Sequence, residues 1–97
     1  MNADSPGEGV GPVLEGSPAG RAVVAAIQKL NRDVSVQDRG AYLRVLVPRC
    51  CRVTREAIER ELGQAFRVPF DLEPLMPAFK GFISMDADSI EWSLEQR

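Results

Sequence analysis

The 97-residue sequence contains no histidine. Without imidazole, the chain lacks the most common general base of enzymes and the most common nitrogen ligand of protein metal sites. It also cannot supply the Glu-x-x-His pairs with which helical bundles hold two irons. We therefore predict that the chain has no catalytic residue and no metal site of its own.

Cysteine is scarce, and the two cysteines, Cys50 and Cys51, are adjacent. A disulfide framework uses several separated cysteines, and a bridge between neighbours would be strained. We therefore expect reduced thiols in a reducing cytosol. Because Arg49 and Arg52 flank the pair and would favour a thiolate, an enzyme that uses Cys50 or Cys51 as its nucleophile is one alternative. No general base or resolving pattern accompanies the thiols, which argues against it.

Long apolar runs are missing as well. No segment approaches the roughly 18 apolar residues of a membrane span, and the N-terminus has neither the basic start nor the apolar run of a signal peptide. We expect a cytoplasmic protein with no membrane partner. Aromatic residues make up only 6% of the chain, and the isoelectric point is about 5.1. With no basic stripe among the aromatics, we also expect no nucleic-acid partner.

The charge that is present is unevenly distributed. Residues 1–38 carry three bases and five acids, residues 39–67 seven arginines and three acids, and residues 68–97 two bases and six acids. The three segments therefore have net charges of −2, +4 and −4. Such polarity in a small protein favours oriented docking on a partner, and the alternative is a set of solvated faces of mixed sign.

Turn residues and hydrophobic periodicity predict one domain over residues 10–97, preceded by a flexible N-terminal tail over residues 1–9. Ser17 and Pro18 start a helix over residues 18–31. Thr54 caps a second helix over residues 55–62, which ends at Gly63. A short helical turn is expected at residues 71–76.

Four strands and an opening segment complete the pattern. They are expected at residues 10–14, 33–37, 42–47, 81–85 and 90–94. Pro12 places the first at a sheet edge or limits its pairing. Leu43, Val45 and Val47 are expected in the core, and Ile90, Trp92 and Leu94 on one face. The fold class is α+β, a two-layer β-α-β-β-α-β-β sandwich with a single domain.

Four segments resemble a known family in order and spacing. They are Val10-Gly11-Pro12-Val13, the stretch from Val34 to Val45, residues 62–66, and Phe79-Lys80-Gly81-Phe82-Ile83. The most specific is Asp38-Arg39-x-Ala41-Tyr42-x-Arg44. Together they resemble the coupling, or effector, proteins of bacterial multicomponent diiron monooxygenases. The resemblance covers about residues 10–94 and is closest to the toluene and alkene monooxygenase branch, with the phenol hydroxylase and methane monooxygenase regulatory proteins more distant.

The resemblance implies a regulatory protein that is not an enzyme. Such effectors carry no cofactor and bind the diiron hydroxylase component near the helices that hold its irons. They couple O₂ activation and electron transfer to hydroxylation or epoxidation of an aromatic or alkene hydrocarbon. A Rieske ferredoxin and a reductase supply the electrons, and the family shares the β-α-β-β-α-β-β sandwich. Which hydrocarbon is oxidised stays open, as does the oligomeric state.

Candidate partner-binding residues lie around the expected central hairpin and the first strand. Tyr42 could instead be partly core, Arg44 could pair with a cross-strand acid, and the first segment could be a plain edge strand. An alternative function is a small-molecule-binding regulatory domain with a ferredoxin-like sandwich, which would be stabilised by its ligand without any hydroxylase. The candidates are Val10, Gly11, Pro12, Val13, Arg39, Tyr42 and Arg44.

Overall fold

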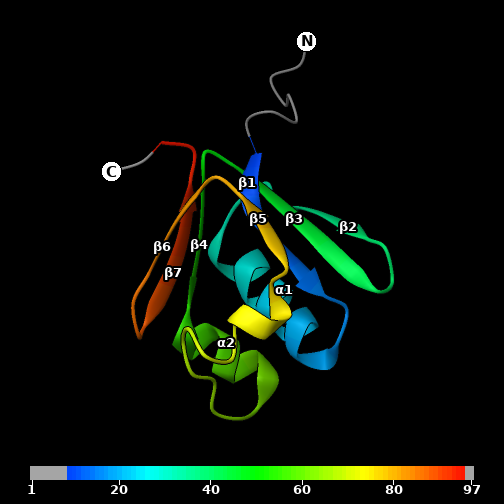
Figure 1. The fold of residues 1–97 in the computed structure, drawn as a ribbon, viewed down its shortest axis with the longest axis vertical. Coiled ribbons are helices and arrows are strands. Elements are labelled where there is room, and N and C mark those ends of the chain that lie inside the picture. The colour runs from blue at the N-terminus through cyan, green and yellow to red at the C-terminus, as the bar shows by residue number, and fades with distance from the viewer. Residues whose placement is uncertain (1–8, 96–97) are drawn as a thin grey trace.

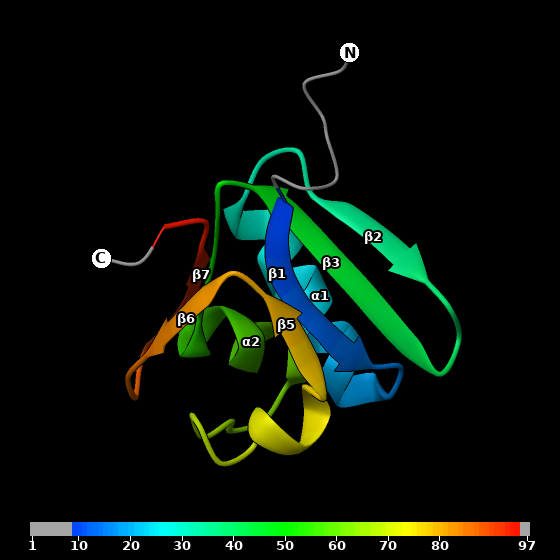
Figure 2. The ribbon, with the colours of Figure 1, turned by 45° about the horizontal axis from the view of Figure 1, so that its top comes forward.

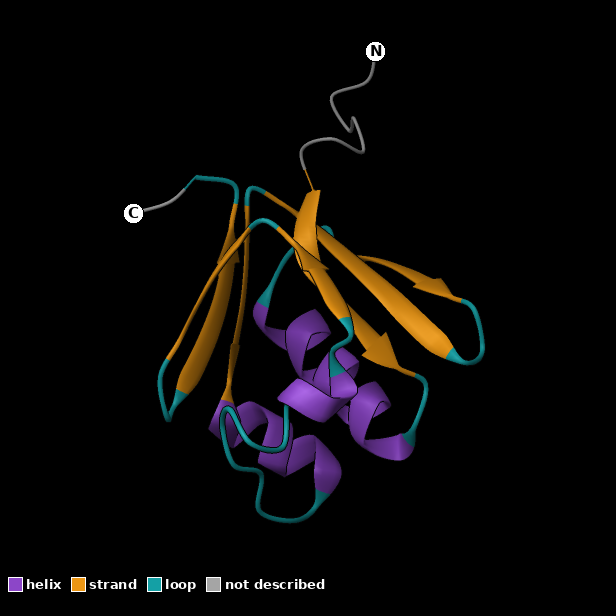
Figure 3. Ribbon diagram, in the orientation of Figure 1, coloured by secondary structure: helices purple, strands orange, loops and turns teal. Residues whose placement is uncertain are grey.

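The computed structural model describes residues 9–95, which form seven strands, two α-helices and one 3₁₀ turn. Figures 1 and 3 show their arrangement. Residues 1–8 of the expected tail lie outside the described residues, whereas Gly9 already belongs to the first strand. The order is β1 (Gly9–Glu15), α1 (Pro18–Leu30), β2 (Ser35–Asp38), β3 (Tyr42–Pro48), β4 (Cys50–Thr54), α2 (Arg55–Leu62), a 3₁₀ turn η2 (Glu73–Leu75), β5 (Ala78–Lys80), β6 (Phe82–Met85) and β7 (Ser89–Ser93). The predicted α+β class is confirmed, and two strands, β4 and β5, are additional.

The strands form two antiparallel sheets, and the helices lie on the same side of both. One sheet has the order β2-β3-β1-β5 and the other β4-β7-β6. In Figure 1 the sheets lean together at the top and the helices lie beneath them. The chain passes between the sheets three times: directly at Arg49 between β3 and β4, through α2 and η2 between β4 and β5, and directly at Gly81 between β5 and β6. Such corners let one chain serve two sheets.

Helix α1 begins and ends where its capping residues predict. The Ser17 hydroxyl accepts the Gly20 N–H at 3.1 Å, and the buried face includes Val23 and Ile27. Asn31 caps the C-terminus and also joins the helix to β4. Its side-chain amide donates to the Ile27 and Arg52 carbonyls at 2.8 Å each, and its oxygen accepts the Arg52 N–H at 3.1 Å.

Helix α2 also follows its sequence signals. The Thr54 hydroxyl accepts the Ala57 N–H at 3.1 Å, and Gly63 ends the helix in the left-handed conformation at φ 80°. Val53 before the cap and Ile58 after it are both buried, as in a hydrophobic staple. The helix therefore packs through a short apolar stripe.

Alternating side chains of the strands fill the core. Leu43, Val45 and Val47 are buried as predicted, and Ile90 and Trp92 are buried on β7. Leu94 was expected on the same face, but it follows the end of β7 and is 36% exposed. The core therefore ends at Trp92, because the strand pairing stops one residue later.

Strand β1 does not lie at a sheet edge, which was one of the two positions that Pro12 allowed. It lies between β3 and β5 in the sheet. Its ladder with β3 is interrupted at Gly11 and Pro12, and pairing resumes at Val13. The missing N–H of proline therefore limits pairing on one side and does not exclude the strand from the interior of the sheet.

Candidate docking surface

Among the described residues, no helix covers the outer face of the four-stranded sheet, which faces the viewer in Figure 2 with α1 behind it. The strand register places Arg44 between Val13 of β1 and Gln37 of β2, and it places Tyr42 beside Glu15. Alternation directs these side chains away from the core. Tyr42 is 45% exposed, and Arg44 is exposed. We call this surface the sheet face.

The turn between β2 and β3 holds Arg39 at one end of the sheet face. The Asp38 carboxylate accepts the Gly40 N–H at 2.8 Å and the Arg21 guanidinium at 3.0 Å. These two bonds, that of Arg21 first, hold the pKa of Asp38 below its usual value. The Arg39 N–H donates to the Tyr42 carbonyl at 2.9 Å. The turn is therefore fixed by its own bonds, and the Arg39 side chain is exposed.

The structure separates the seven predicted residues into two groups. Arg39, Tyr42 and Arg44 are exposed, and Val13 is half-buried on the same face. In contrast, Val10, Gly11 and Pro12 are buried. Because Val10 and Pro12 alternate inward with Leu14, they support the sheet from its core side. Only Val13 of that segment presents its side chain to the sheet face.

An open groove of about 540 Å³ lies where β5 passes into β6. Two large apolar side chains, Phe79 and Phe82, are 44% and 49% exposed there. The sequence predicts a hairpin from the strands at residues 81–85 and 90–94 and does not predict the groove, although Phe79 and Phe82 on either side of Gly81 are a usable signal. The lining residues are Phe79, Gly81, Phe82, Ile83, Ser84, Glu91 and Ser93.

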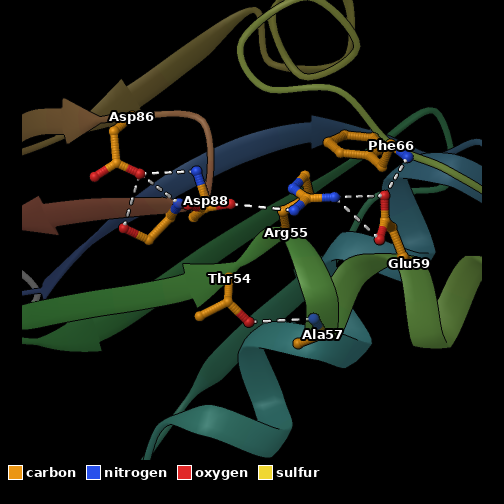
Figure 4. Close-up of polar contacts among 8 residues, drawn as sticks. Thr54, Arg55, Ala57, Glu59, Phe66, Asp86 and Asp88 are labelled. Atoms are coloured by element: carbon orange, nitrogen blue, oxygen red, sulfur yellow. Dashed lines mark hydrogen bonds and ion pairs between the residues drawn. The ribbon is translucent and has the colours of Figure 1, made fainter.

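A polar network fixes the β6–β7 turn against α2 (Figure 4). The Arg55 guanidinium contacts Glu59 at 3.2 Å and Asp88 at 3.1 Å, and the Arg55 N–H donates to the Asp88 carbonyl at 2.8 Å. Glu59 also accepts the Phe66 N–H at 2.9 Å. Within the turn, the Asp88 N–H donates to Asp86 and, as the leading cause, lowers the pKa of Asp86. The hairpin that carries the groove is thereby held to the helix.

The arginines of the helices and of the strands differ in their pairing. Arg21, Arg55 and Arg60 of the helices each contact a carboxylate. Among the described residues, the arginines of the β2–β3 turn, β3, the β3–β4 corner and β4 have no ion-pair partner and are exposed. Unpaired surface cations beside uncovered sheets suit an acidic partner surface. They are Arg39, Arg44, Arg49 and Arg52.

The two cysteines are separate thiols on opposite faces of β4. Cys51 pairs in register with Trp92, and burial raises the pKa of its thiol to about 12. Cys51 is therefore protonated at neutral pH and is not the nucleophile of that alternative, because burial of its thiol outweighs the effect of the flanking arginines. Cys50 is half-buried and its Sγ donates to a Glu91 carboxylate oxygen at 2.9 Å.

Residues 9–95 bring no three metal-ligating side chains together. Within that same range, neither helix combines the length and the apolar character needed to cross a membrane.

Comparisons with known proteins agree with the resemblance. Residues 8–93 match the MmoB/DmpM family. The effector subunit of the alkene monooxygenase system of Xanthobacter autotrophicus (strain ATCC BAA-1158 / Py2) is 38% identical over 85 residues, which cover 86% of this chain and 83% of that protein. A solved structure of a phenol hydroxylase–regulatory protein complex contains a chain with the same fold. Its TM-score is 0.78 at 21% identity, with 88% of this chain and 97% of that chain covered. The predicted resemblance is therefore confirmed, and the chain belongs to the MmoB/DmpM family.

Proposed function

We propose that this chain is the effector component of a cytoplasmic multicomponent diiron monooxygenase. It binds the hydroxylase and couples O₂ activation and electron transfer to hydroxylation or epoxidation of an aromatic or alkene hydrocarbon. A Rieske ferredoxin and a reductase deliver the electrons. The observation that carries this proposal is the family match over residues 8–93, together with the 38% identity to an alkene monooxygenase effector subunit.

A protein that acts by binding alone changes a reaction only through differential affinity. The effector binds one conformation of the hydroxylase more tightly than another and thereby raises the population of that conformation. Coupling free energies of this kind are typically about 1–3 kcal/mol, which corresponds to roughly 5–150-fold in an equilibrium constant. The role therefore requires a rigid contact surface and no reactive side chain of its own.

The sheet face supplies such a surface. Arginine and tyrosine are enriched among residues that dominate binding energy, and Arg39, Tyr42 and Arg44 are exposed on or beside one sheet. Val13 lies beside Arg44 and adds an apolar contact. We assign the partner contacts to these four side chains, with the buried Val10, Gly11 and Pro12 holding β1 in position beneath them.

Titration of the chain into hydroxylase, ferredoxin and reductase tests the proposal. Product formation per O₂ consumed is expected to rise several-fold and to saturate near stoichiometric effector. Arg44→Ala should raise the effector concentration that gives half of the maximal effect by about tenfold. Arg60→Ala, which removes an exposed arginine of α2, should leave it unchanged. If rate, coupling and product distribution do not change on addition of the chain, the proposal is refuted.

A further inference from the structure

The groove at β5 and β6 lies outside the residues assigned above. We infer that this groove receives an apolar side chain of the hydroxylase whose acidic neighbours pair with Arg52 and Arg49, which makes it a second anchor of the docking surface. The inference rests on the proposed function, because it names the partner of a surface on the same effector.

The groove spans the junction of the two sheets. Phe79 belongs to β5, which pairs with β1, and Phe82 belongs to β6, which pairs with β7. In register, Phe82 faces Ser93 and Ser84 faces Glu91. These positions alternate with that of the buried Trp92 and therefore lie on the side of the sheet away from the core. The groove therefore combines Phe79, at the junction of the sheets, with outward side chains of β6 and β7.

The apolar side chains in this groove are unusual for a chain with so few aromatics. Phe79 and Phe82 leave about half of their surface in water, at 44% and 49%. They are neighbours across Gly81, so their exposed surfaces are contiguous with one depression of about 540 Å³. Contiguous exposed apolar surface with a polar rim is typical of protein interaction sites. The depression is open, whereas small-molecule sites enclose most of their ligand.

Two arginines beside the groove favour an occupant that carries acidic residues. Arg52 lies opposite Glu91 in the β4–β7 ladder, and Arg49 joins the strands β3 and β4 at the corner beside Leu94, whose N–H donates to the Arg49 carbonyl at 2.8 Å. Both arginines are exposed and form no salt bridge among residues 9–95, although the charge of Arg52 helps to lower the pKa of Asp86. The occupant therefore carries carboxylates around its apolar side chain. A second copy of this chain would bring the same arginines to the contact, so that like charges would face one another.

The size of a stable interface links the groove to the sheet face. A specific interface buries roughly 800 Å² on each partner, against a total accessible surface of 5900 Å² for this chain. Seven lining residues cannot supply that area alone. Strand β5 leads from the groove to β1, where Ala78 lies opposite Val13 of the sheet face, so we assign the groove and the sheet face to the same partner.

Affinity measurements with matched phenylalanine variants test the inference. Phe79→Ser and Phe82→Ser should each weaken binding to the purified hydroxylase by about tenfold or more. Phe70→Ser is the control, because Phe70 is 69% exposed but does not line the groove, and its affinity should stay within about twofold of the wild type. Arg52→Gln should weaken binding, and Arg60→Gln should not. Thermal melts of each variant establish that it is folded.

A protection experiment gives a second readout on the wild-type chain and needs no variant. Cys50 contacts Glu91 at the groove, so bound hydroxylase should slow alkylation of Cys50, measured by mass spectrometry of the effector peptide. An unchanged alkylation rate at saturating hydroxylase overturns the inference.

The outcomes separate the inference from the function on which it rests. If the wild type neither binds nor stimulates the hydroxylase, the proposed function fails. If it does both and the groove variants bind like Phe70→Ser, only the groove assignment fails. Self-association that Phe82→Ser abolishes, or thermal stabilisation by a hydrocarbon alone that Phe82→Ser abolishes, would assign the groove to another occupant and overturn the inference.

Discussion

Gly81 connects the two sheets and places the groove, so its replacement is an informative perturbation. Its φ of 104° lies in the region that side chains rarely adopt, and a Cβ built on it would lie 2.8 Å from the Ser93 carbonyl oxygen and 2.8 Å from a methyl carbon of Val10. The Ser93 carbonyl belongs to β7, which is held between β4 and β6. Gly81→Ala therefore creates a contact that the backbone cannot easily relieve.

The magnitude follows from two contributions. An unfavourable positive φ costs a side chain about 1–2 kcal/mol, and overpacking of a close contact costs about 1–3 kcal/mol, so Gly81→Ala should lower the free energy of unfolding by about 2–5 kcal/mol. Gly63→Ala is the matched control. Gly63 has φ 80°, and no atom lies within 4 Å of the added Cβ. Only the conformational contribution of about 1–2 kcal/mol applies there.

Urea unfolding, followed by the fluorescence of the single tryptophan, measures both variants. Trp92 is fully buried, so its emission reports on the whole transition. The midpoint of Gly81→Ala should fall further than that of Gly63→Ala with no change in slope, and Gly81→Ala should also weaken hydroxylase binding. Equal midpoints for the two variants would show that the close approach of the sheets at Gly81 does not contribute to stability.

Three further predictions concern local features. Thr54→Ala should destabilise the protein by about 1 kcal/mol in the same assay, because it removes the cap of α2, and Thr54→Ser should restore most of the loss. The lowered pKa values of Asp38 and Asp86 mean that their contribution to stability is present above about pH 4 and is lost as the pH falls through those lowered values. Asp86→Asn should therefore reduce the loss of unfolding free energy as the pH falls. An unchanged dependence on pH would show that the hydrogen bonds of Asp86 in the turn do not stabilise the protein. At pH 8, iodoacetamide should modify Cys50 well before Cys51, whose thiol has a pKa of about 12. Modification of both at equal rates would contradict the burial of Cys51.

Local sequence signals predicted the elements whose stabilising contacts are local. The caps Ser17 and Thr54 and the stop at Gly63 lie where they were expected. The alternation of β3 identified its buried face. These signals depend on side chains within four residues of one another, or on a period of two, and both can be read without knowing the neighbours in space.

Two strands and part of the candidate site depended on distant segments. Strand β5 has three exposed residues and is a strand only because it pairs with β1. Strand β4 follows β3 after one residue, Arg49 at φ 69°, in a segment where the local pattern predicts no strand. For the same reason, Val10, Gly11 and Pro12 were candidates for partner contact although they are buried beneath the sheet face. The burial of a strand residue depends on which strands pair with its own, and the local sequence pattern predicts neither the pairing nor the burial.

The sequence by itself determined the absence of imidazole chemistry, the helix boundaries, the α+β class and the resemblance to the effector family, because composition, capping and alternation are local properties. Tertiary structure alone decided which faces stay uncovered. It left Arg39, Arg44, Arg49 and Arg52 exposed and without a salt bridge among the described residues, and it brought Phe79 and Phe82 to one groove. These features arise from the register of two sheets whose strands are far apart in the chain, and that register exists only in the folded protein.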